Sequence, residues 1–185
     1  QVARLFPNAR SKERAYRADL QNLLGQLLPS LTVIHEPSGV TGGDPDFLIE
    51  NRNHAALCYL ETKDIGTDLA FGASATPHDR EQFDRYRAAF ATLVYTDYLT
   101  FRFYRGGTLR DEIRIADIDG LKITPLPDAC RALAERLADF TARLEPVKTA
   151  ACLASLMASK ARLVQRIVLR ALQKNSSAEN VKHTG

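Results

Sequence analysis

The chain has 185 residues, of which 45% are apolar, and its 25 Lys/Arg against 22 Asp/Glu give a net charge of +3. This composition fits a globular protein with one main domain, and no apolar run approaches the roughly 20 residues that a membrane span needs. The N-terminus lacks a signal-peptide profile, and three widely spaced cysteines without a CxxC pair predict neither a disulfide framework nor a zinc site. We therefore expect a soluble protein of the reducing cytosol.

The spacing of apolar residues predicts alternating helices and strands. In chain order, we expect a helix at 11–28, strands at 31–35, 46–50 and 55–63, a mobile Gly/Thr/Ser/Pro-rich loop at 64–77, a helix at 77–90, strands at 92–96, 100–105 and 110–115, and helices at 128–144 and 149–174. The polar turn at 51–54 joins its two flanking strands as a hairpin, and residues 175–185 predict a disordered tail. The pattern favours an α/β domain with a central mixed sheet flanked by helices, followed by a helical extension.

Two acidic residues and one lysine stand at the ends of neighbouring predicted strands. Asp46 opens one strand, and Glu61 and Lys63 end the next, where alternation places both on one face. Two carboxylates on adjacent strands can hold a hard divalent cation through oxygen. The alternatives are a turn or capping aspartate at Asp46 and a solvated strand end with a salt bridge at Glu61 and Lys63.

Three further polar side chains have helical spacing that could bring them to the same site. Glu13 shares the inward stripe of the first helix, so it is either a further metal or water ligand or a partner of the helix dipole. Gln82 and Tyr86 lie four residues apart on one helix face. They could orient a phosphate, a water or the lysine, or they could simply mark the boundary between buried and exposed faces.

These elements together resemble the PD-(D/E)XK nuclease superfamily, in the subset with a QxxxY element. The resemblance rests on segments 43–47 (GDPDF), 61–63 (ETK) and 82–86 (QFDRY). Segments 60–69 and 93–104 are similar to the N-terminal nuclease domains of single-polypeptide restriction-modification enzymes, in which a helical connector and an adenine-methylating domain follow. The resemblance implies a restriction-endonuclease-like nuclease domain at 1–146 and a connector at 147–174. Because the chain begins with Gln1 and carries no methyltransferase motif, it is expected to be either a piece of a longer polypeptide or a stand-alone nuclease.

The resemblance also implies an activity, a cofactor and roles for individual residues. Asp46, Glu61 and Glu13 would bind Mg²⁺, which would polarise a phosphoryl oxygen and lower the pKa of the attacking water. Lys63 would hold that nucleophile and neutralise the developing charge, with Gln82 and Tyr86 in accessory roles. The expected protein is thus a Mg²⁺-dependent DNA endonuclease of a restriction-modification system, with DNA and a methyltransferase domain as its partners.

Charge is unevenly shared along the chain, which hints at an anionic partner. Residues 148–185 hold 7 Lys/Arg against 1 Asp/Glu. Arg162, Arg166, Arg170 and Lys174 form a stripe on the last predicted helix that could follow a DNA backbone, or that could be a solvated face. Two other functions stay open: an inactive nucleic-acid-binding or docking module, and a repair or RNA nuclease built on the same core.

Overall fold

In the computed structural model, residues 14–72, 75–120 and 122–142 are described, together with the single positions 157, 161 and 165. The helices are α2 (Arg14–Leu27), α3 (Pro77–Ala89) and α4 (Pro127–Ala142), and the strands are β1 (Thr32–His35), β2 (Phe47–Glu50), β3 (Ala56–Thr62), β4 (Thr92–Thr96), β5 (Thr100–Arg105), β6 (Thr108–Arg114), β7 (Ala116–Asp119) and β8 (Lys122–Pro125). The predicted connector and tail, with the basic stripe, lie outside the described residues apart from those three positions. No helix of the described part is long and apolar enough to cross a bilayer.

Strands β1 to β6 form one mixed sheet in sequence order. All neighbouring strands are antiparallel except β3 and β4, which are parallel, with Glu61 beside Tyr95. A parallel pair requires a crossover connection, and this one contains α3. The predicted α/β class with a mixed sheet flanked by helices is confirmed.

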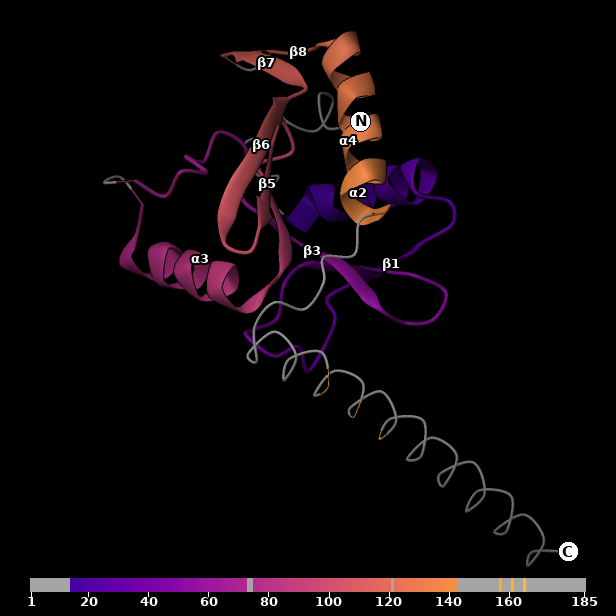
Figure 1. Ribbon diagram of the computed structural model, residues 1–185. Helices are drawn as coiled ribbons and strands as arrows, with labels where there is room; N and C mark the ends of the chain where they lie inside the picture. The colour runs from indigo at the N-terminus through magenta and orange to yellow at the C-terminus, as the bar shows by residue number, and fades with distance from the viewer. Residues whose placement is uncertain are drawn as a thin grey trace, which may run out of the picture.

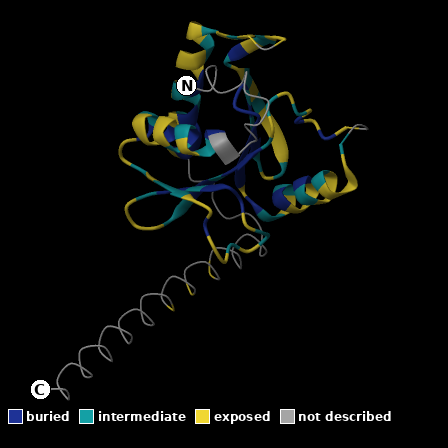
Figure 2. Ribbon diagram, turned by 180° about the vertical axis from the view of Figure 1, so that it is seen from behind, coloured by how far each residue is buried: buried dark blue, intermediate teal, exposed yellow. Residues whose placement is uncertain are grey.

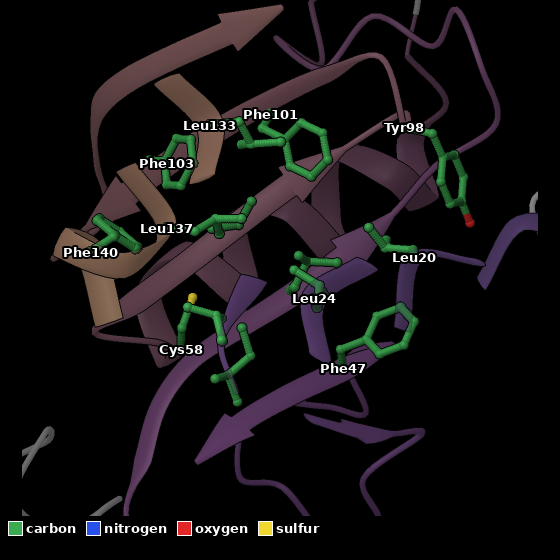
Figure 3. Packing of buried hydrophobic residues seen from close by; sticks show 14 of the residues in the cluster. Leu20, Leu24, Phe47, Cys58, Tyr98, Phe101, Phe103, Leu133, Leu137 and Phe140 are labelled. Carbon is green, nitrogen blue, oxygen red and sulfur yellow. The ribbon is translucent and has the colours of Figure 1, made fainter. Parts of the chain in front are cut away.

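Helices cover both faces of the sheet, so the domain has three layers (Figure 1). Helices α2 and α4 lie on one face, where Leu20, Leu24 and Leu137 pack against Phe47 and Phe103 (Figure 3). Helix α3 covers the other face over an aromatic cluster. Buried residues therefore follow the central strands, while the outer faces of the helices are exposed (Figure 2). Each of these helices buries one stripe of apolar residues, and this is why the spacing of apolar residues predicted them.

The segment expected to be a mobile loop contributes to the core in its described part. Leu69 and Phe71 are buried in the cluster beneath α3, and the Phe71 ring lies 4.4 Å from the Phe83 ring between centroids. Helix α3 then begins at Pro77, with the hydroxyl of Thr76 accepting a hydrogen bond from the Asp79 amide. This N-cap satisfies one of the amide groups that a helix start leaves unpaired.

The small hairpin formed by β7 and β8 was not predicted from the sequence. Its two strands have four residues each and lack a clear apolar alternation. Contacts distant in sequence fix its place, because the amide of Ile115 donates to the carbonyl of Leu99 and the amide of Leu126 donates to the carbonyl of Ile115. Strand β6 also begins at Thr108, two residues before the predicted start.

Candidate active site

The hairpin of β2 and β3 brings Asp46 and Glu61 together at one end of the sheet. Phe47 pairs with Leu60, so the residue before β2 lies next to Glu61. The backbone amide of Asp46 lies 3.3 Å from Glu61 Oε2, and the amide of Thr62 donates to Asp46 Oδ2 at 2.8 Å. The hydroxyl of Thr62 donates to the same oxygen. Asp46 and Glu61 are only 7% and 5% exposed, and carboxylates so deeply buried require partners.

Lys63 and Gln82 complete a network on the α3 side of this acidic pair. Lys63 Nζ donates to Gln82 Oε1 at 2.6 Å, and Gln82 Nε2 donates to Glu61 Oε1 at 2.9 Å. Lys63 Nζ also lies 3.6 Å from Glu61 Oε1 and 3.3 Å from Asp79 Oδ1. The side-chain amide of Gln82 thus bridges Lys63 and Glu61, so the orientations of these three side chains depend on one another.

Tyr86 packs against the loop that leads into Asp46. A Cβ atom at Gly43 would lie 2.6 Å from Tyr86 Cε1, and Gly43 has a φ of +132°. Only glycine permits both this backbone conformation and this close approach. Burial raises the pKa of Tyr86, and the nearby negative charge of Glu61 raises it further. Tyr86 is therefore a neutral phenol whose ring fixes the loop.

On the opposite face of the sheet, α2 contributes an arginine to the site. Arg17 Nη2 lies 2.7 Å from Asp46 Oδ1, and Arg17 Nη1 lies 3.4 Å from Glu36 Oε1. The side chains of Arg17 and Asp46 are 13% and 9% exposed, so water screens this ion pair little. The site therefore receives side chains from both helical layers, with the strand ends between them.

The structure brings together five of the six predicted site residues, while Glu13 lies outside the described residues. The predicted site did not include Arg17, Asp79 or the hydroxyl of Thr62. Helical spacing could have indicated Arg17 and Asp79. Arg17 is one turn beyond Glu13, and Asp79 is one turn before Gln82, so each lies on the same helix face as a predicted site residue. Thr62 alternates with Glu61 and Lys63 along β3, and its hydroxyl donates to Asp46.

The donor set fits a hard divalent cation such as Mg²⁺ in its chemistry. Among the described residues, no group of three or more His, Cys, Asp or Glu side chains is placed to hold a metal ion. However, Mg²⁺ in phosphate-processing sites is commonly held by only one or two carboxylates plus waters and substrate oxygens. Asp46 and Glu61, joined by a hydrogen bond across two strands, supply such a pair.

Comparison with one solved structure supports this fold. The chain is similar to a protein of the cryo-EM structure of the DrdV–DNA complex, with a TM-score of 0.53, 17% identity, and coverage of 77% of this chain and 13% of that one. A weaker likeness to the type IIG restriction endonuclease BpuSI has a TM-score of 0.42 and 15% identity, and covers 71% of this chain and 17% of that one. The chain thus spans a small part of the length of both. No known family profile and no curated protein matches the sequence.

Proposed function

We propose that this chain is the nuclease module of a restriction-modification system and hydrolyses DNA phosphodiesters with Mg²⁺. One observation carries the proposal: Asp46, Glu61 and Lys63 meet at one end of the sheet, with Gln82 joining the lysine to the glutamate. The likeness of the fold to a protein solved in complex with DNA supports DNA as the substrate. A methyltransferase domain in a longer polypeptide would be a further part of the system, as the sequence resemblance implies.

Each side chain has a role that follows from its contacts. Asp46 and Glu61 would hold the ion through oxygen, and Mg²⁺, when bound, supplies polarisation of a phosphoryl oxygen and a lower pKa for water. Lys63 would orient the attacking water and place a positive charge beside the phosphate as negative charge develops. Gln82 and Asp79 hold Lys63 in position through its ammonium group.

Plasmid cleavage by the full chain tests the proposal, with variants that remove charge and keep size. We expect Asp46→Asn, Glu61→Gln and Lys63→Met each to slow Mg²⁺-dependent cleavage by about a thousandfold, as for loss of a group that stabilises the transition state. The matched controls are Asp44→Asn and Glu81→Gln, which change exposed carboxylates and should cleave at the wild-type rate. Cleavage that persists at the same rate in chelator, or in all three site variants, would refute the assignment.

A non-catalytic DNA-binding module is the second candidate, and one observation favours it. Both oxygens of Asp46 already accept hydrogen bonds or ion pairs from within the chain, as in a purely structural acidic pair. Such a module would bind DNA in a salt-dependent manner without cutting it. Calorimetric titration with Mg²⁺ separates the two, because only the nuclease requires metal binding that Asp46→Asn abolishes.

A further inference from the structure

We infer that Arg17 competes with the divalent cation for the carboxylate of Asp46, so that metal binding requires the guanidinium to leave Asp46. This inference rests on the proposed function, because it concerns the same metal site. Arg17 Nη2 contacts Asp46 Oδ1 at 2.7 Å. The other oxygen, Oδ2, accepts from both the amide and the hydroxyl of Thr62. Arg17 therefore contacts the carboxylate oxygen that Thr62 leaves available.

Electrostatic repulsion prevents the Arg17 guanidinium and a divalent cation from binding the same carboxylate oxygen of Asp46 together. The ion pair has little contact with water, since the two side chains are 13% and 9% exposed. A guanidinium and Mg²⁺ on one carboxylate oxygen would lie within a few ångströms of each other, and like charges at that distance repel strongly where water is scarce. In contrast, an acidic pair without metal gains from the arginine, because each buried carboxylate needs a compensating charge.

The structure also contains a second partner for the displaced arginine. Arg17 Nη1 already lies 3.4 Å from Glu36 Oε1, and the side chain of Glu36 is 66% exposed. A guanidinium that leaves Asp46 can keep this contact and move towards the surface of the site. There its planar fork of donors suits a phosphodiester. Arg17 is thus a positioning residue that balances the acidic pair in the metal-free chain.

Calorimetric titration of the full chain with Mg²⁺, without DNA, tests the competition. We expect Arg17→Met to bind Mg²⁺ about tenfold more tightly than the wild type, because a buried carboxylate that loses its partner gains strongly from another cation. The control Arg131→Met removes an equal charge from an exposed arginine of α4 and should leave the affinity unchanged. A merely structural role for Arg17 predicts weaker binding in Arg17→Met, which is the opposite sign.

The outcomes separate this inference from the proposed function. Equal or weaker Mg²⁺ binding by folded Arg17→Met, with Asp46-dependent binding in the wild type, overturns the competition and leaves the nuclease proposal standing. No Asp46-dependent binding in either protein refutes the metal site and the competition together. Binding by Arg17→Met alone supports the competition.

A measurement on the wild type decides the matter if Arg17→Met does not fold. The Nε–Hε signal of Arg17 in an arginine-selective NMR spectrum should move as Mg²⁺ is added, with the same midpoint as the calorimetric heat. Arg17→Lys, which keeps the positive charge, identifies the signal by its absence. An Arg17 signal that stays in place at saturating Mg²⁺ overturns the inference.

Discussion

Replacing Gln82 with methionine tests how strongly the site depends on one amide. Gln82 makes two hydrogen bonds to charged groups, with Lys63 at 2.6 Å and Glu61 at 2.9 Å. Such bonds contribute about 1.5 to 3 kcal/mol each. Lys63 keeps its contacts with Glu61 and Asp79 in the variant, and water can reach the partly buried amide position. We therefore expect Gln82→Met to lower the free energy of unfolding by about 2 to 3 kcal/mol, less than the sum of the two bonds.

The same change should affect cleavage through the position of Lys63. A displacement of a reacting group by about 1 Å can cost about a hundredfold in rate, so we expect a loss of that order in single-turnover plasmid cleavage. Urea unfolding followed by circular dichroism measures the stability, and the exposed Gln26→Met on α2 is the matched control. A Gln82→Met protein with wild-type stability and cleavage rate would show that the bridge seen in the structure has no energetic role.

Three more predictions follow from the geometry of individual residues. Gly43→Ala should lower the free energy of unfolding by about 2 to 4 kcal/mol in urea, because it adds a clash with Tyr86 to an unfavourable φ. The control Gly66→Ala has a positive φ but open space around it, so it should cost only about 1 to 2 kcal/mol. Burial raises the pKa of the Cys58 thiol to about 12. Its contribution to stability is therefore intact below the ordinary thiol pKa and is lost as the pH rises from there towards 12. Labelling of Cys58 by a thiol reagent at pH 8 in the folded chain, detected by peptide mapping, would contradict this. The hydroxyl that caps α3, and then the neighbouring lysine, lower the pKa of Asp79. The contribution of Asp79 to stability is present above its ordinary pKa of 3.8 and is lost as the pH falls through the lowered value. Asp79→Asn should therefore make the free energy of unfolding less dependent on pH on the acid side. An unchanged pH dependence there would argue against the contacts of Asp79 with Thr76 and Lys63.

Local patterns were sufficient for most of the secondary structure. Helices α2, α3 and α4 lie where helices were predicted within the described residues, because each buries a stripe with helical period. Strands β2 and β3 were predicted for a similar reason, as apolar runs around a polar turn. The β7–β8 hairpin was missed because its short strands are placed by contacts with distant residues, among them the carbonyl of Leu99.

The candidate site shows the same division between local and distant information. Glu61 and Lys63 belong to one strand end, so the alternation of side chains sufficed to place them together. The contact of Arg17 with Asp46 joins α2 to the start of β2, and the contact of Asp79 with Lys63 joins α3 to β3. Neither pair has a fixed spacing in sequence, which is why only their helical neighbours, Glu13 and Gln82, were considered.

Residues close together along the chain were enough to predict the main elements, their amphipathic faces, and two acidic residues and a lysine at strand ends. The cation that compensates Asp46, in contrast, depends on how the helices pack against the sheet. Asp46 pairs with Arg17 from one helical layer, while Glu61 pairs with Lys63 and Gln82 towards the other. The physical reason is burial: a carboxylate excluded from water takes its partner from whichever element packs beside it, and packing is a property of the whole fold.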